Sequence, residues 1–344
     1  MALLATHNAK LNLFGNSCTP HEASVIVIPV PWAVTVSSRS STTLGPESIL
    51  KASYQMKSSV PAYIGGNNLD IAMLPIPHDW KMTSDTLRHH TLGHIHAMES
   101  GLPMSNFKYS FAQRADQCTI ELKEKIKAKA HKYLKQGKMV AILGGDHSTP
   151  MGLIEALADY HNNMGILHIG AQPAMRETYK GIKYSHASIM HNALELAHIV
   201  QIVQLGLRNC SPEEVQNIKL HEGRVHPFYD SDLKRKLLQG TSWHEICASI
   251  IALLPERVYI SFNIDGLDAK LCPSTGAPVP NGLELYEVCY LIENMVKVGI
   301  KIVGFDLCEV APGENMDWDA QVGSQVLQHL CVAMRASQTC TKAK

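Results

Sequence analysis

Short apolar runs recur along the 344-residue chain, and each is hydrophobic at both odd and even positions. A strand with one exposed face alternates polar and apolar residues, whereas a strand buried on both faces is apolar throughout. The pattern therefore predicts strands in the interior of a parallel sheet. The runs are Ser24–Pro29, Asp70–Leu74, Met139–Leu143, Met164–Ile169, Ile199–Leu205, Val258–Ile264 and Ile300–Phe305.

Segments with helical character separate most of these runs. Ser211, followed by a proline and two glutamates, is typical of a helix start, because the serine caps the first turn and the acids suit its positive end. Alternating strands and helices predict one α/β domain over residues 1–344, with a mainly parallel sheet covered by helices on both faces. The helical segments are Ala115–Gln136, Thr149–His161, Ile189–Leu196, Ser211–Leu220, Ser231–Gln239, Ser242–Leu254, Leu283–Val298 and Asp317–Ala336.

The stretch from His78 to Tyr109 shows no clear periodicity, so we expect a surface loop there. It contains the histidines His89, His90, His94 and His96. Two of them, His90 and His94, would share one face of a helix at a spacing that can hold zinc, but no glutamate follows the first and Gly93 weakens a helix. We therefore expect surface histidines in a loop rather than a metal site.

The composition is that of a folded globular protein, with 45% hydrophobic and 18% charged residues. The 31 Lys+Arg balance 31 Asp+Glu, and zero net charge argues against a nucleic-acid partner. The most apolar segment, Val25–Val36, is too short for a membrane helix and contains two prolines. Nine widely spaced cysteines favour reduced thiols, and Met1–Gly15 lacks a signal-peptide pattern. These features predict a cytoplasmic protein without a membrane or nucleic-acid partner.

Chemistry in such a sheet is expected beyond the carboxyl ends of the strands, where ligands bind in open α/β folds. Four of the predicted strands run into polar or glycine-rich motifs at these ends. The motifs are Gly144–Ser148 (GGDHS), Gly170–Arg176 (GAQPAMR), Ser261–Asp268 (SFNIDGLD) and Asp306–Glu314 (DLCEVAPGE), with Tyr184–Met190 (YSHASIM) after the second of them.

The motifs resemble those of the ureohydrolase superfamily, the arginases, agmatinases and relatives that release urea from guanidino compounds. The similarity is closest to the agmatinase-like branch and extends from Pro29–Trp32 and Leu44–Ile49 to Asp319. It implies a three-layer α/β sandwich of the arginase/deacetylase type and a trimeric or hexameric assembly. It also implies catalysis by two adjacent Mn²⁺ ions, whose bridging hydroxide attacks the guanidinium carbon.

The metal ligands that this resemblance implies are largely missing. The family pattern supplies two histidines and four aspartates, of which this chain keeps His147 and Asp265. The other four positions are Gly170, Gln172, Ala174 and Asn263. Two hard dications need several negative charges close together, and a single carboxylate is not enough. We therefore expect no metal cofactor, and only vestigial ligand positions at His147 and Asp265.

Loss of the ions removes the nucleophile. A metal can lower the pKa of bound water from about 15.7 to about 7. This shift lowers the free energy needed to form hydroxide from that water by roughly 12 kcal/mol. His186 acting as a general base would typically contribute only about 10²–10⁴-fold. Hydrolysis by the family mechanism is therefore expected to be absent or vestigial. One open alternative is a mononuclear site in which His168 joins His147 and Asp265.

Residues of the substrate pocket are better preserved. By resemblance, Glu309 matches the carboxylate that pairs with the substrate guanidinium, and His186 matches a histidine that shuttles protons. Thr275 belongs to a loop similar to the family's turn beside the pocket, although Asn281 stands where a second glycine is usual. Structural alternatives remain open, since Glu309 could cap a helix or pair with an arginine, and a strand-end histidine is often a hydrogen-bonded core residue.

The sequence thus predicts a metal-free pseudoenzyme with the ureohydrolase fold and a binding, regulatory or assembly role. It would either sense a small guanidino or amino-acid-like ligand through Glu309 and His186, or assemble as a homo-oligomer or with an active paralogue. The alternative is an active agmatinase-type hydrolase of a guanidino or amidine C–N bond with a rebuilt metal site.

Overall fold

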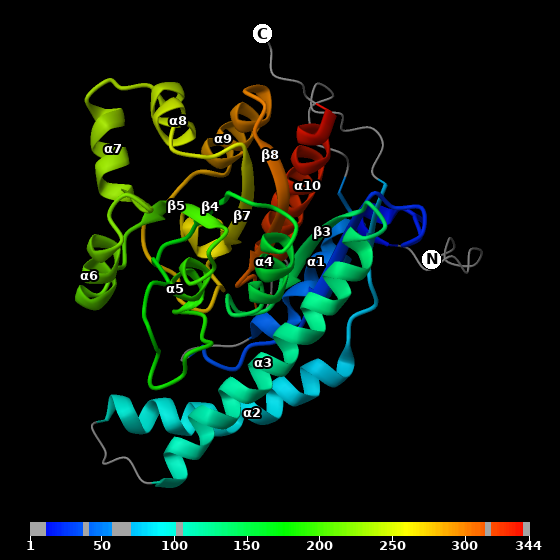
Figure 1. Cartoon of the computed structure of the whole chain (residues 1–344), viewed down its shortest axis with the longest axis vertical. Helices are drawn as coiled ribbons and strands as arrows, with labels where there is room; N and C mark the ends of the chain where they lie inside the picture. The colour runs from blue at the N-terminus through cyan, green and yellow to red at the C-terminus, as the bar shows by residue number, and fades with distance from the viewer. Residues whose placement is uncertain (1–11, 37–40, 57–69, 101–105, 314–317, 340–344) are drawn as a thin grey trace.

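An eight-stranded sheet crosses the molecule in the order β2-β1-β3-β8-β7-β4-β5-β6, and all neighbouring strands are parallel (Figure 1). The computed structural model describes residues 12–36, 41–56, 70–100, 106–313 and 318–339. The predicted parallel sheet is confirmed. Its strands are β1 (Val25–Val30), β2 (Ile71–Met73), β3 (Met139–Gly144), β4 (Met164–Ile169), β5 (Ile199–Leu207), β6 (Val225–Tyr229), β7 (Arg257–Asn263) and β8 (Lys301–Cys308).

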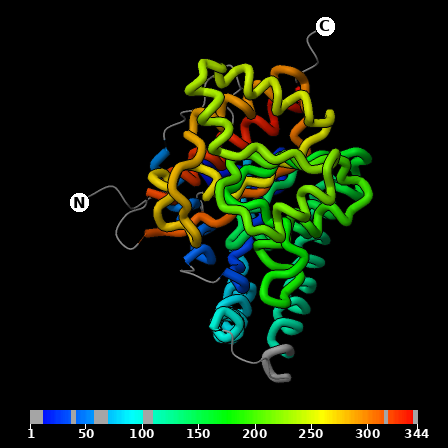
Figure 2. Tube along the Cα trace, turned by 90° about the vertical axis from the view of Figure 1, so that its left-hand side faces the viewer, coloured from blue at the N-terminus to red at the C-terminus, as the bar shows by residue number. Residues whose placement is uncertain are grey.

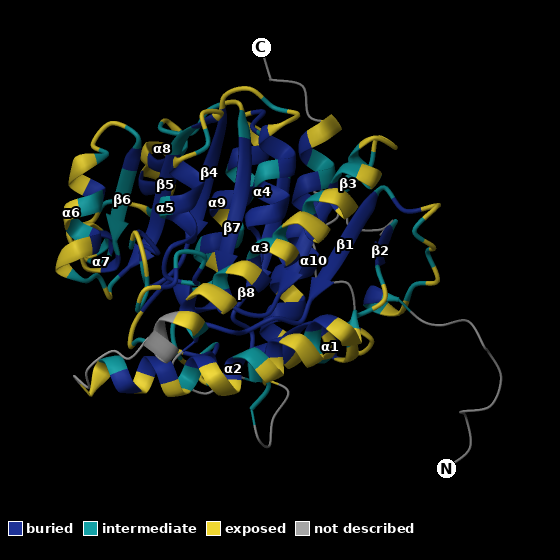
Figure 3. Ribbon diagram, turned by 60° about the horizontal axis from the view of Figure 1, so that its bottom comes forward, coloured by how far each residue is buried: buried dark blue, intermediate teal, exposed yellow. Residues whose placement is uncertain are grey.

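Helices cover both faces of the sheet, so the predicted three-layer sandwich is also confirmed (Figure 3). Successive strand residues point to opposite faces, and both sets are buried and apolar: Val27 and Leu143 face one helical layer, Ile28 and Ile142 the other. One layer holds α1 (Gly45–Ser53), α7 (Asp230–Leu238), α8 (Trp243–Ile251), α9 (Leu285–Lys297) and α10 (Trp318–Thr339). The other holds α2 (His78–Glu99), α3 (Asn106–Leu134), α4 (Met151–Ala158), α5 (Ile189–Leu194) and α6 (Pro212–Leu220).

Three elements, α1, α2 and β6, are absent from the sequence prediction. Strand β6 lies at the sheet edge, where only Val225 is buried and Pro227 is tolerated. Its pattern is therefore not the continuous apolar run of an interior strand. The start of α6 follows the prediction, because Ser211 accepts a hydrogen bond from the Glu214 backbone N–H in a capping box. Within the described ranges, no helix has the length and apolar character needed to cross a bilayer.

The expected loop from His78 to Tyr109 is wrong, because α2 and the start of α3 occupy it. These two helices pack side by side and extend away from the sheet (Figure 2). The buried positions of α2 recur with helical spacing, but four of them are polar: Ser84, Arg88, Thr91 and His94. Ser84 and Arg88 bond the backbone of the segment after β1: Ser84 Oγ accepts from Ala33 N, and Arg88 donates to Ala33 O. A search for apolar periodicity cannot detect such a face.

The four clustered histidines therefore lie on α2 and not in a loop. His89, His90 and His96 are exposed, as predicted, whereas His94 is buried. Its Nε2 donates a hydrogen bond to the Lys180 carbonyl oxygen at 2.7 Å. His94 thus ties α2 to the segment that follows β4.

Candidate functional site

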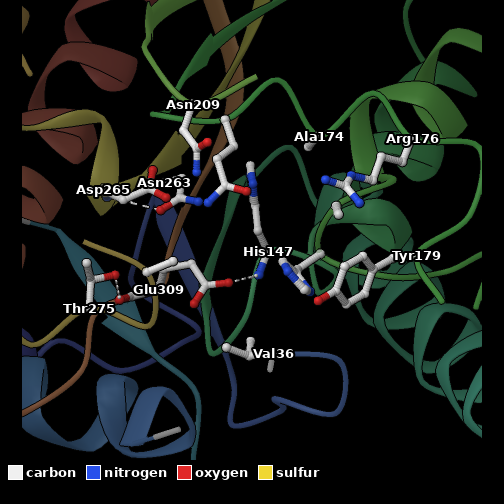
Figure 4. A pocket seen from close by; sticks show the side chains of 14 residues that line it. Val36, His147, Ala174, Arg176, Tyr179, Asn209, Asn263, Asp265, Thr275 and Glu309 are labelled. Atoms are coloured by element: carbon white, nitrogen blue, oxygen red, sulfur yellow. Dashed lines mark hydrogen bonds between the residues drawn. The ribbon is translucent and has the colours of Figure 1, made fainter. Parts of the chain in front are cut away.

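A cavity of about 240 Å³ opens where β3, β4, β7 and β8 end (Figure 4). It brings together eight of the nine site positions selected from the sequence, whereas Gly170 does not line it. The carboxyl ends of parallel strands lie at the same edge of a sheet, so motifs that are far apart in the chain come close together here. The lining residues are Val36, His147, Gln172, Ala174, Arg176, Tyr179, His186, Ala187, Asn209, Asn263, Asp265, Thr275, Ala277 and Glu309.

Glu309 is held on one wall of the cavity by three hydrogen bonds, each of which involves a backbone group. Its Oε1 accepts a hydrogen bond from His147 N at 3.0 Å, its N–H donates to Gly145 O, and its carbonyl accepts from Thr275 Oγ1 at 2.8 Å. The residue has φ of +65°, a strained conformation that is typical of functional sites. Burial, followed by the nearby Asp146 charge, raises the pKa of Glu309 well above its usual value. Among the described residues, nothing hydrogen-bonds its second oxygen.

His186 is fixed by Thr35, which the sequence did not indicate as a site residue. Thr35 Oγ1 accepts from the His186 backbone N–H at 3.1 Å and shares a 2.8 Å hydrogen bond with its Nδ1. The ring makes an edge-to-face contact with Tyr179. Burial lowers the pKa of His186, and the positive charge of Arg176 lowers it further, although Asp146 opposes both. Its imidazole is therefore neutral near pH 7 and can exchange hydrogen bonds with a ligand.

His147 lies at the bottom of the cavity with its ring nitrogen already in use. Its Nε2 is 2.8 Å from Ser261 Oγ and 3.7 Å from Asp306 Oδ1, and its ring stacks on His168 at 5.2 Å. Burial lowers the pKa of His147 well below its usual value, and that of His168 to about 3. Both rings are thus neutral groups packed beneath the cavity.

Asp265 and Asn263 close a turn at the end of β7. The Asn263 side chain accepts from Asp265 N, and Asp265 Oδ1 accepts from Ala171 N, each at 3.0 Å. Burial raises the pKa of Asp265 to about 6, although Ala171 and the Arg208 charge oppose it. Arg208 stabilises this side of the cavity, which we call the Asp265 wall, because its guanidinium donates to six backbone carbonyl oxygens from neighbouring segments. These belong to Gly206, Asp265, Gly266, Leu267, Val279 and Pro280.

A row of polar side chains crosses the sheet below the cavity. Gln204, His168, Ser261 and Asp306 are paired in register on β5, β4, β7 and β8, so they point to the same face. Gln204 Nε2 donates to His168 Nδ1 and to a backbone carbonyl. The motifs contain Ser261 and Asp306, but only the strand register shows that they are neighbours.

Asp306 is the most constrained member of this row. Its carboxyl is fully buried, and burial raises its pKa to about 7, although polar groups of Tyr259 and Ser261 lower it. Within the described part of the chain, neither oxygen has a hydrogen bond of good geometry. A carboxyl in this setting is costly to ionise.

Replacing Asp306 with Asn should therefore change how stability depends on pH. Between about pH 4 and 7 the folded carboxyl keeps a proton that the unfolded chain releases, so this group stabilises at low pH and loses that effect as pH rises. From pH 5 to pH 8, the stability of Asp306→Asn relative to wild type should rise by about 1–3 kcal/mol. Urea unfolding at both pH values measures this. Asp232→Asn, at an exposed position on α7, is the control, and parallel profiles for Asp306→Asn and wild type would contradict the assignment.

The wall opposite Glu309 is formed by the segment after β4 and carries Arg176 and Tyr179 (Figure 4). Its outer part is tied to the α2–α3 pair. Besides the His94 hydrogen bond, Asp116 on α3 accepts from the backbone N–H groups of Lys183 and Tyr184. Arg176 is the last residue of the Gly170–Arg176 motif and Tyr179 lies outside the motifs, but no sequence feature indicated that either side chain lines the site.

Over the described ranges, no group of three or more His, Cys, Asp or Glu side chains is placed to hold a metal ion. At the positions matching the family ligands, the cavity instead presents the amides of Gln172 and Asn263 and the methyl group of Ala174.

The parallel three-layer fold and the pocket at its strand ends define the class of protein. The arginase family model matches residues 23–333, and the chain belongs to the arginase family.

Relatives with assigned names align over most of the chain. An N(1)-aminopropylagmatine ureohydrolase from Thermus thermophilus is 28% identical over 327 residues, which is 95% of each protein. An agmatinase from Neisseria meningitidis is 26% identical over 89% of this chain and 86% of its own. Among solved structures, the agmatine ureohydrolase of Thermoplasma volcanium superposes with a TM-score of 0.69 at 23% identity, covering 92% of this chain and 91% of the other.

Proposed function

We propose that this arginase-family chain binds a guanidinium- or amidinium-bearing ligand and does not hydrolyse it by the two-metal mechanism. One observation carries the proposal: the two retained ligand positions are used by the protein itself. His147 Nε2 bonds Ser261, and Asp265 Oδ1 accepts from Ala171 N. The other four positions have no carboxylate or imidazole.

The residues present do not fit a pair of divalent cations. Such ions require oxygen ligands and enough negative charge to offset their mutual repulsion. Asp265 is the sole carboxylate among the six positions, and burial favours its neutral form. Without the ions, no side chain in the cavity supplies a hydroxide near neutral pH.

The residues that we expect to recognise a guanidinium, Glu309 and His186, are by contrast present in the cavity. A guanidinium presents pairs of parallel N–H donors that match a carboxylate well. Glu309 offers a buried carboxyl group whose second oxygen has no described partner, and His186 lines the same cavity as a neutral hydrogen-bonding group. Thr275 keeps Glu309 in place through its backbone carbonyl. These features support a binding role, either as a sensor or as a non-catalytic subunit of a homo- or hetero-oligomer.

A cytoplasmic location belongs to the same proposal. The eight cysteines within the described ranges are all free. Unpaired thiols, most of them buried, are typical of proteins in a reducing compartment.

The test combines metal analysis, turnover and binding. Protein produced with added Mn²⁺ should contain far less than one metal ion per chain by elemental analysis. It should release no urea from agmatine, arginine or guanidinobutyrate when Mn²⁺ is supplied. Calorimetry should nevertheless detect binding of butylguanidine, which carries a guanidinium and an uncharged tail. About two ions per chain with metal-dependent urea release would establish the active hydrolase instead, and absence of butylguanidine binding would overturn the binding role.

A further inference from the structure

The two walls of the cavity carry ionisable groups of opposite sign. Glu309 and Asp265 line one wall, and Arg176 lies on the other with Tyr179 beside it (Figure 4). A guanidinium held at Glu309 therefore extends its substituent toward a fixed cation. The charge at that far end decides which substituents the cavity accepts.

Arg176 is held in place without using its hydrogen-bond donors. Its guanidinium lies over the Tyr179 ring at 5.5 Å, a cation–π contact that orients the plane. The nearest carboxylate is Glu214, whose Oε2 is 3.7 Å from Arg176 Nε. That oxygen already accepts from Ser211 N and Oγ in the cap of α6. Over the described ranges, no N–H of this guanidinium makes a hydrogen bond.

Neutral hydrogen-bonding groups line the same cavity as this cation. The side-chain amides of Asn209 and Gln172 line the same cavity, and neither has a hydrogen-bond partner among the described residues. A guanidinium fork with unused N–H groups suits a carboxylate, which accepts two parallel hydrogen bonds. A protonated amine in the same place would meet a like charge.

We infer that Arg176 makes the site selective for a guanidino or amidino carboxylate over a guanidino amine. The inference rests on the proposed binding function and specifies its ligand class. The cavity is small, about 240 Å³, which favours a short spacer between the two charged groups of the ligand. The relatives named for agmatine or aminopropylagmatine act on compounds whose tails are cationic, so this chain would differ from them in charge preference.

Three ligands that share a guanidinium and differ in tail charge test the inference. These are 4-guanidinobutyrate, butylguanidine and agmatine, with anionic, uncharged and cationic tails. By calorimetry, 4-guanidinobutyrate should bind about tenfold tighter than butylguanidine, and agmatine should bind more weakly than either. Arg176→Gln should reduce 4-guanidinobutyrate affinity to that of butylguanidine while leaving butylguanidine unchanged. Arg176→Glu should reverse the order in favour of agmatine.

Lys180→Gln provides the matched control. Lys180 lies four residues further along the same wall, and its ammonium is also near the Tyr179 ring, but its side chain does not line the cavity. This variant should keep the wild-type order of affinities.

The possible failures are distinguishable. Equal affinity for the three ligands, or an equal loss of all three in Arg176→Gln, would overturn the selectivity of Arg176 and leave the binding function standing. Failure of every guanidinium compound to bind would overturn the binding function itself.

Discussion

Restoring the four missing ligands together should convert the chain into a manganese-binding protein with about two ions per chain. The variant carries Gly170→Asp, Gln172→His, Ala174→Asp and Asn263→Asp. The three new carboxylates supply the charge that two dications require, and the new histidine completes the ligand set of six. Elemental analysis of protein grown with Mn²⁺ measures the result, with wild type expected far below one ion. Gln172→His alone adds no carboxylate and should leave the metal content unchanged.

The structure identifies the main obstacle to this restoration. A Cβ at Gly170 would lie 2.8 Å from His168 Nε2, so an aspartate there requires the histidine ring to move. The ring is held by Gln204 and stacks on His147. Ala174, with φ of +51°, is less of a difficulty, because aspartate tolerates this conformation better than most residues.

A fifth substitution separates the two explanations of a failure. If the fourfold variant binds poorly, His168→Ala added to it removes the clash and should raise the metal content. If the fivefold variant also remains without metal, the changes that abolished metal binding extend beyond the six ligand positions. The prediction that four substitutions restore the site is then wrong.

Glu309→Gln should weaken butylguanidine binding by about 50-fold, because the amide keeps the shape and the hydrogen bond from His147 N but removes the charge that pairs with a guanidinium. Since burial raises the pKa of Glu309, wild-type affinity should rise with pH as the carboxylate forms, and the variant should lose that dependence. Calorimetry over a pH series measures both effects.

Glu213→Gln, an exposed change in the first turn of α6, serves as the matched control and should bind as wild type does. A Glu309→Gln variant with affinity within threefold of wild type and an unchanged pH profile would show that the guanidinium does not pair with this carboxylate.

The interior of the fold could be predicted from sequence because its strands are apolar on both faces. Each of the seven predicted runs corresponds to a strand of the sheet. Helix α2 could not be predicted, because its buried face is partly polar: Ser84 and Arg88 bond backbone groups after β1, and Thr91 bonds the Leu87 carbonyl within the helix. Edge strand β6 could not be predicted either, because only one of its five residues is fully buried and the strand therefore lacks a continuous apolar run.

Some residues of the candidate site could likewise be predicted from the sequence and others could not. Motifs at strand ends indicated His147, Asp265 and Glu309, and the fold brings these residues to one cavity. Arg176 and Tyr179 follow β4 without any characteristic spacing, so their position opposite Glu309 becomes visible only once the chain is folded. The partners of Asp306 likewise depend on strand register, which a hydrophobic pattern does not specify.

The two walls of the cavity rest on different parts of the molecule. Arg208 fastens the Asp265 wall to the end of β5, so that wall is as rigid as the sheet. The Arg176 wall is instead anchored at its outer end on the projecting α2–α3 pair, through His94 and Asp116. Arg176 itself lies at the inner end of this wall, where its backbone N–H donates to the Ala187 carbonyl and the Asn217 side chain of α6 donates to the Met175 carbonyl. A displacement of α2 and α3 would therefore be felt first at the outer part of the wall, around Lys180 to Tyr184, and the position of Arg176 relative to Glu309 would be maintained by the sheet and α6.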